Sequence, residues 1–178
     1  MAVKMKHLIT THDVITMSLD IITAIEFLHN KYSIIHMDIA TRNCLQRKRV
    51  KLTDAAMGGC LFPFDYQCLG DNKSRPVKWM SIESLIFHKS NAPSDIWAFG
   101  VTLWELLTHS RQPYEEVDSF DMGAFLLEGQ RLEKPPSCPS PLWKLIKSCW
   151  QDEAESRPTA AHLREELLKL RRDIKDFI

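Results

Sequence analysis

The sequence predicts a single, mainly helical domain with only short β-strands. Long stretches have apolar residues at helical spacing, whereas the β-branched runs are only two or three residues long. At 178 residues, with 44% hydrophobic and 26% charged residues, the chain is long enough to bury one core. We therefore expect one domain over residues 1–178, with no linker and no internal repeat.

Several segments carry the helical pattern. The segment 13–30 is apolar around most of its circumference, which predicts a helix buried on nearly all sides. A strongly apolar segment with Ser94 as its cap and its end near Thr108 predicts a central buried helix. Further helices are predicted over 119–128, with Gly129 as the stop signal, over 140–150, and from Thr159 onward.

The remaining segments predict short strands and one long loop. Residues 32–53 contain short β-branched runs, and residues 57–76 contain glycines and prolines with little periodicity. A loop of that length inside a compact domain is usually functional.

Charge and cysteine content exclude several classes of function. Lys and Arg total 23, as do Asp and Glu, so no net field favours nucleic acid or an anionic membrane. The five cysteines are widely spaced without a Cys-x-x-Cys pair, which predicts reduced thiols in a cytoplasmic protein. The apolar stretch 21–28 is shorter than the roughly 20 residues that span a bilayer, and no export signal precedes it, so we expect no membrane insertion.

Two short motifs stand out, His36-Met37-Asp38 with Asn43 in the first and Asp54-Ala55-Ala56 in the second. Phosphoryl transfer from ATP needs an acceptor for the substrate's hydroxyl proton and oxygen ligands for magnesium. In this order and at this spacing, the motifs resemble the catalytic loop (36–43) and the magnesium loop (54–56) of protein kinases.

The rest of the chain resembles the C-terminal lobe of a tyrosine kinase. The matching segments are 40–43, 76–80, 81–83 in the place of Ala-Pro-Glu, 94–100, 138–139, 149–150 and 157–158. A narrower resemblance, over 61–76, is to the activation segment of the Ryk and Derailed receptors. These are Wnt-binding relatives of receptor tyrosine kinases, and their kinase-like domains are generally regarded as pseudokinases. The resemblance implies a protein-kinase-like C-terminal lobe.

The resemblance also implies residue roles at the active site. Asp38 would be the catalytic base, with Arg42 and Asn43 beside it in the catalytic loop. Asn43 and Asp54 would bind Mg²⁺, and Leu45 with Asp54 would lie against ATP. The alternative for Asp38 and Asn43 is a structural role, in which they only hydrogen-bond the loop backbone.

Other positions are implied to be structural. Asp95 would hold the catalytic-loop backbone, Glu83 would form a buried ion pair with Arg157, and His36 would be a packed core histidine. Within the activation segment (54–83), Tyr66 is a candidate phosphorylation site. The alternative is that Tyr66 anchors the segment.

Three departures from an active kinase stand out. Ala55 and Ala56 replace the phenylalanine and glycine of the magnesium loop, and Met37 replaces an arginine that pairs with a phosphorylated activation loop. Nothing before residue 13 resembles a Gly-rich loop or the strand lysine, so we expect the N-terminal lobe to be absent. ATP and Mg²⁺ are implied by the resemblance, but we expect at most half an ATP pocket.

These observations favour a Ryk-like pseudokinase that serves as a cytoplasmic signalling scaffold. Its expected partners are signalling proteins, and either the missing N-terminal lobe or a partner helix on the upper face. That face includes Leu45, Val50, Leu52 and the N-terminal end of the first helix. One alternative is the C-terminal lobe of an active tyrosine kinase. The other is a truncated protein-interaction module.

Overall fold

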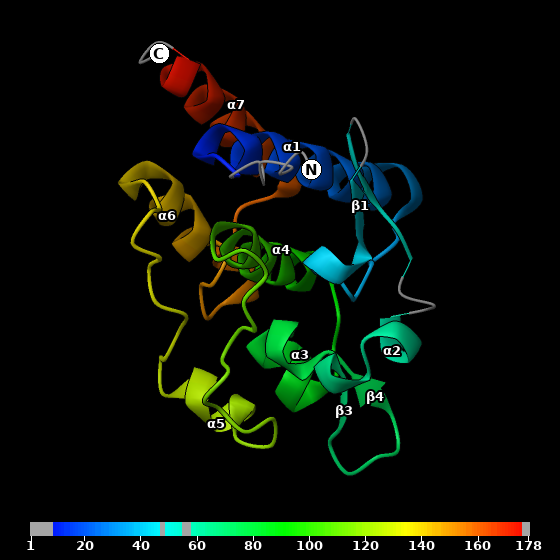
Figure 1. The fold of residues 1–178 in the computed structure, drawn as a ribbon. Coiled ribbons are helices and arrows are strands. Elements are labelled where there is room, and N and C mark those ends of the chain that lie inside the picture. The colour runs from blue at the N-terminus through cyan, green and yellow to red at the C-terminus, as the bar shows by residue number, and fades with distance from the viewer. Residues whose placement is uncertain (1–8, 47–48, 55–57, 176–178) are drawn as a thin grey trace, which may run out of the picture.

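The computed structural model describes residues 9–46, 49–54 and 58–175. The predicted fold class is confirmed: the described part is mainly helical, with two short antiparallel sheets (Figure 1). In chain order, its α-helices and strands are α1 (Thr11–Phe27), β1 (Cys44–Gln46), β2 (Val50–Leu52), α2 (Gly58–Leu61), β3 (Gln67–Cys68), β4 (Ser74–Arg75), α3 (Ile82–Phe87), α4 (Ala92–Leu107), α5 (Met122–Leu127), α6 (Ser140–Ser148) and α7 (Ala160–Lys175).

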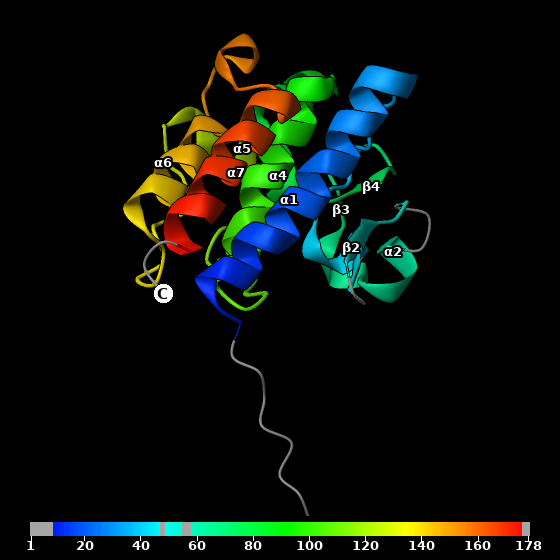
Figure 2. The ribbon, with the colours of Figure 1, turned by 90° about the horizontal axis from the view of Figure 1, so that it is seen from above.

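Helix α4 lies at the centre of the core. It contacts α1 and α6, and α1 packs along α7 (Figure 2). Trp97, Phe99 and Leu103 of α4 are completely buried, as the apolar pattern of this segment predicted. Helices α3 and α5 lie together at the opposite end of the lobe from α1 and α7 (Figure 1).

Capping residues correct the predicted start of the first helix. Helix α1 begins at Thr11, two residues before the predicted start, because Thr10 caps it. The Thr10 hydroxyl accepts from the Asp13 amide at 3.1 Å, and the Asp13 carboxylate accepts from the Thr10 amide at 2.9 Å. The helix ends at Phe27 and continues as one π-helical turn, Leu28–Tyr32, so the predicted end at residue 30 falls inside that turn.

The prediction that Ser94 caps the central helix is wrong. The cap is Asn91, whose side-chain oxygen accepts from the Ser94 amide at 2.9 Å. Ser94 is the third residue of α4 and returns the contact, because its hydroxyl accepts from the Asn91 amide at 3.2 Å. The helix therefore begins three residues earlier than the capping serine alone would place it.

Other predicted boundaries also shift. The described part of the 57–76 loop contains α2 and the β3–β4 hairpin, and α3 was not predicted. Helix α5 starts at residue 122 and not at residue 119, while Gly129 follows its end with φ +81°, as a stop signal should. Helix α6 ends at Ser148, so Trp150 lies beyond it. The Thr159 hydroxyl accepts from the His162 amide at 3.2 Å and caps α7 as predicted.

The β1–β2 hairpin positions the second motif. Leu45 pairs with Lys51 in antiparallel register, and the hairpin brings Thr53 back to Asn43. The Thr53 amide donates to the Asn43 carbonyl at 2.9 Å, and the Thr53 hydroxyl donates to the same oxygen at 3.0 Å. The residue that precedes Asp54 is thus fixed to the end of the catalytic loop.

Among the described helices, none is both long and apolar enough to cross a bilayer. All five cysteines lie in the described ranges as free thiols, and Cys138 and Cys149 are buried.

Candidate active site

Asp95 of α4 fixes the backbone of the catalytic loop. Its carboxylate accepts from the amides of His36 and Met37 at 2.8 and 2.9 Å, and it contacts His29 Nε2 at 2.8 Å. Met37 has φ +65°, a conformation that costs a non-glycine residue about 1–3 kcal/mol. The two hydrogen bonds from backbone amides to the buried Asp95 carboxylate offset that strain. Asp95 therefore holds this loop, as the resemblance implied.

His36 connects the two motifs. Its Nε2 lies 2.7 Å from the Thr53 carbonyl, and its Nδ1 lies 3.3 Å from the Asp38 amide. A carbonyl only accepts and an amide only donates, so the neutral imidazole carries its hydrogen on Nε2. His36 is half-buried, not fully enclosed in the core as expected, and its hydrogen bonds give it a structural role.

Asp38, Arg42 and Asn43 come together at the end of the loop. The Asn43 side-chain amide donates to the Asp38 backbone carbonyl at 2.7 Å and to its carboxylate at 2.8 Å. Arg42 forms an ion pair with the other carboxylate oxygen of Asp38. The Arg42 and Asp38 side chains are only 4% and 5% exposed, so each neutralises a charge that has left water.

Tyr66 of the activation segment enters this cluster. Its hydroxyl donates to Asp38 at 2.5 Å and accepts from Arg42 Nε at 3.0 Å. The Arg42 guanidinium carbon lies 4.8 Å from the centroid of the Tyr66 ring and 4.2 Å from that of the Trp79 ring. The Tyr66 hydroxyl is therefore hydrogen-bonded to the carboxylate that would accept the hydroxyl proton of a substrate.

Gly58 makes this arrangement sterically feasible. A Cβ atom at position 58 would lie 2.0 Å from the Tyr66 hydroxyl and 3.3 Å from the Asp38 carboxylate. Only glycine leaves room there for the phenol. Because the two residues are eight positions apart in a segment with little periodicity, the sequence offered no signal that would have identified Gly58.

The protonation of the cluster follows from its contacts. Burial, followed by the hydrogen bond to Asp38, raises the pKa of Tyr66, so the phenol keeps its proton and remains the donor. Burial lowers the pKa of Arg42, but Asp38 and Tyr66 outweigh it, and the pKa is raised overall. The Tyr66 phenol and the Arg42 guanidinium therefore both keep their protons near neutral pH.

Glu105 is a supporting residue that the sequence analysis did not identify. Its carboxylate accepts from the Thr41 amide at 3.2 Å, the Thr41 hydroxyl at 2.6 Å and the Trp79 indole at 2.8 Å. Burial raises its pKa despite these donors. The available signal was an acidic residue inside the apolar helix α4, since a buried charge needs partners.

Glu83 and Arg157 join the activation segment to the lower helices. The guanidinium makes a bidentate contact, with distances of 2.7 and 2.8 Å to the two carboxylate oxygens. Arg157 also donates to the carbonyls of Pro93 at 3.1 Å and Gln151 at 2.9 Å, and its side chain is completely buried. Burial favours the neutral acid, but the hydrogen bonds from Arg157 and Ser81 lower the pKa of Glu83.

Asp54 lies on a different cavity from Asp38. It lines a cavity of about 400 Å³ together with Phe27, Ile34 and Thr53, whereas Asp38 and Tyr66 line a separate one of about 480 Å³. The oxygen donors of Asn43 and Asp54 suit Mg²⁺ chemically. Ala55 and Ala56 lie outside the described residues.

The upper face is partly exposed. Leu45 is 62% exposed, while Val50 and Leu52 are half-buried. Leu45 therefore presents its side chain to solvent on the hairpin that precedes Asp54.

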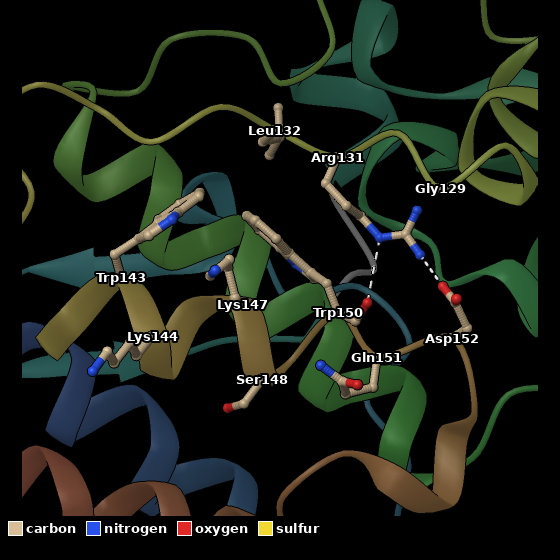
Figure 3. Close-up of a pocket in the computed structure, with 10 residues that line it drawn as sticks. All are labelled: Gly129, Arg131, Leu132, Trp143, Lys144, Lys147, Ser148, Trp150, Gln151 and Asp152. Atoms are coloured by element: carbon tan, nitrogen blue, oxygen red, sulfur yellow. Dashed lines mark hydrogen bonds and ion pairs between the residues drawn. The ribbon is translucent and has the colours of Figure 1, made fainter. Parts of the chain in front are cut away.

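A second cavity of about 480 Å³ lies beside α6 (Figure 3). Trp143 and Trp150 form an edge-to-face pair there, with ring centroids 5.8 Å apart. Arg131 donates to the Trp150 carbonyl at 3.3 Å and forms an ion pair with Asp152 (Figure 3). No residue of the two motifs lines this cavity, and Arg131 is occupied in holding the chain around it.

Comparisons with known proteins show the family of the chain. A family profile described as protein tyrosine and serine/threonine kinase matches residues 2–167. Tyrosine-protein kinase Dnt of Drosophila melanogaster is 42% identical over 96% of the chain, and tyrosine-protein kinase RYK of Homo sapiens is 43% identical over 84%. A Caenorhabditis elegans protein named inactive tyrosine-protein kinase RYK is 39% identical over 84%.

The chain spans 29%, 25% and 26% of these three relatives. The chain therefore belongs to the protein tyrosine and serine/threonine kinase family, with RYK and Dnt among its relatives.

Proposed function

We propose that this chain is a Ryk-like pseudokinase that signals by binding other proteins and does not itself transfer phosphate. The observation that carries the proposal is the hydroxyl of Tyr66, which is hydrogen-bonded to Asp38 and Arg42. A substrate hydroxyl would have to displace this phenol before Asp38 could accept its proton.

The sequence of the magnesium loop supports the same proposal. Ala55 removes the phenylalanine that packs this loop in active kinases, and Ala56 removes the freedom of a glycine beside Asp54. Met37 removes the arginine that a phosphorylated activation segment would bind. One relative of the chain is itself named as inactive.

ATP and Mg²⁺ enter the proposal through the family. When bound, ATP supplies the phosphoryl group and magnesium screens its charge. In this chain Asn43 and Asp54 would be the oxygen ligands, Leu45 would lie against the nucleotide, and Asp38 would accept the proton. We expect these residues not to support phosphoryl transfer, because the Asp38 carboxylate already accepts hydrogen bonds from Tyr66 and Asn43 and pairs with Arg42.

The biological setting is also a proposal. The resemblance of residues 61–76 to the Ryk and Derailed activation segments supports a cytoplasmic role in Wnt-type signalling. Signalling proteins would be the partners, and an N-terminal lobe or a partner helix would cover the upper face.

A second candidate function is tyrosine phosphorylation. It is favoured by the intact contacts among Asp38, Arg42 and Asn43, and by the kinase names of most relatives. Under this alternative, Tyr66 would be a removable block on a working site.

One assay decides between the two candidates. Phosphate transfer from ATP to a tyrosine peptide and to the chain itself is measured with Mg²⁺ or Mn²⁺ for the parent, Tyr66→Phe and Tyr66→Phe/Asp38→Asn. We expect no transfer by any of the three. Transfer that appears in Tyr66→Phe and disappears in the double variant would overturn the proposal and establish the kinase.

A further inference from the structure

A groove with apolar and acidic lining residues lies between α3, α5 and the segment 152–155. Its volume is about 410 Å³, and its lining includes Ile82, Phe87, Leu126 and Leu127. Leu126 is completely buried and belongs to the floor, whereas Phe87 and Leu127 are 65% and 64% exposed. Two large apolar side chains on adjacent helices therefore face water beside a hollow.

The architecture keeps these side chains outside the core. Helix α3 ends at Phe87, and His88 follows it with φ +54°, so the chain turns away immediately. Helices α3 and α5 pack against each other through other positions, since a Cβ atom at Gly123 of α5 would lie 4.0 Å from Ile86. The exposure of Phe87 and Leu127 is consequently not needed for the packing of the two helices.

The surroundings of the groove are acidic. Four of its lining residues are acidic, Glu83, Asp152, Glu153 and Glu155, against one lysine, Lys89. On the facing segment, Glu153 and Glu155 line the groove and are exposed. The other two lining carboxylates, Glu83 and Asp152, are neutralised by Arg157 and Arg131.

We propose that this groove docks a basic amphipathic segment of a signalling partner, with apolar side chains against Phe87 and Leu127 and with Lys or Arg facing Glu153 and Glu155. Charge selects this occupant, because four carboxylates line the groove against one lysine, Lys89, and Glu153 and Glu155 form no ion pair within the described part of the chain. The same charge repels an acidic segment or an anionic membrane.

Docking at this groove rests on the proposed scaffold function, because a scaffold needs a surface that binds its partners. Its site shares no residue with the Asp38 and Tyr66 cavity. Binding at the groove is measured without a catalytic readout, so the two proposals can fail independently.

The probe is a pair of fluorescein-labelled helical peptides that share one leucine face and carry either lysines or glutamates on the other. Fluorescence anisotropy with the chain should show binding of the lysine peptide only. Phe87→Ser/Leu127→Ser should weaken that binding about tenfold or more, because central apolar anchors dominate such contacts. Glu153→Lys/Glu155→Lys should weaken it as well, and added salt should weaken binding to the parent.

Matched controls separate the groove from general stickiness. Phe64→Ser removes a side chain that is 90% exposed in the activation segment, and Glu165→Lys reverses an exposed charge on α7. Both should bind the lysine peptide as the parent does. All the substitutions are at exposed positions, and circular dichroism checks that each variant is folded.

Three results would overturn the proposal. The first is equal binding of the glutamate peptide, and the second is unchanged binding by either groove double variant. The third is a dimer in sedimentation analysis that Phe87→Ser/Leu127→Ser dissociates, because a second copy would then be the occupant.

Discussion

Two buried or nearly buried arginine side chains each form an ion pair with a carboxylate in this molecule, and they differ in where the neighbouring groups come from. Arg157 pairs with Glu83 and is held further by the carbonyls of Pro93 and Gln151. Arg42 pairs with Asp38, and its other polar contacts are Tyr66 and Asp65 of the activation segment.

This difference divides the lobe into two parts. The fixed part contains the Glu83–Arg157 pair, and the controlled cluster contains Asp38 and Arg42, whose accessibility depends on the Tyr66 side chain. The contacts of Arg157 are made by the backbone carbonyls of Pro93 and Gln151 and by the carboxylate of Glu83 at the start of α3. The contact of Tyr66 with Asp38 can be lost by rotation of one side chain or movement of one segment. The Arg157–Glu83 pair was implied by the family resemblance. The Tyr66–Asp38 contact was not, and it decides whether the Asp38 carboxylate is accessible.

Breaking the fixed pair should have the largest effect. Arg157→Ala leaves the Glu83 carboxylate without its bidentate partner in a buried site, and we expect a loss of about 3–5 kcal/mol in the free energy of unfolding. Urea denaturation measures this loss. Arg157→Lys keeps the charge without the planar fork and should fall between the parent and the alanine variant.

Arg164→Ala is the matched control. Arg164 pairs with Glu26 at 2.6 Å, but the side chains are 35% and 21% exposed, so its removal should cost at most about 1 kcal/mol. Equal losses for the two alanine variants would contradict the assignment of Arg157 to the fixed part.

Gly58→Ala should open the controlled cluster. The added Cβ would lie 2.0 Å from the Tyr66 hydroxyl, so we expect the phenol to leave Asp38, with a destabilisation of about 1–3 kcal/mol. Phosphorylation of Tyr66 by an added tyrosine kinase, followed by mass spectrometry, should become faster. Gly59→Ala is the control, because nothing lies within 4 Å of a Cβ at that position. Equal modification of Tyr66 in both variants would show that Gly58 does not position it.

The pH dependence of stability should change least. The pKa of Glu83 is lowered in the folded chain from its ordinary value of 4.5, so its contribution is present above that pH and is lost as the pH falls through the folded value. Glu83→Gln should therefore show a shallower loss of stability below about pH 4.5. Urea midpoints across the acid range test this, because the other carboxylates titrate in both proteins. Identical slopes would exclude Glu83 as a contributor.

Much of the fold and part of the site could be predicted from the sequence. The apolar periodicity of α4 predicted a central helix, and the resemblance to the kinase catalytic loop placed Asp38 and Asn43 in one short loop. The cap of α4 was assigned to Ser94 because serine is a favoured cap, but Asn91 forms the same reciprocal contact one turn earlier.

Contacts between distant segments could not be predicted in this way. Tyr66 reaches Asp38 across 28 positions, and Gly58 admits it only because the activation segment folds back on the catalytic loop. Glu105 reaches Thr41 across 64 positions. Such contacts depend on tertiary packing, which local sequence patterns do not contain.

Hydrogen–deuterium exchange of the parent and Tyr66→Phe tests the central claim most directly. If the phenol hydroxyl is what holds the activation segment on the catalytic loop, removing it should speed exchange within residues 58–75 and leave α4 and the Glu83–Arg157 region unchanged. Unchanged exchange in residues 58–75, or faster exchange spread over α4 and α7, would contradict the division into a fixed lobe and a site controlled by Tyr66.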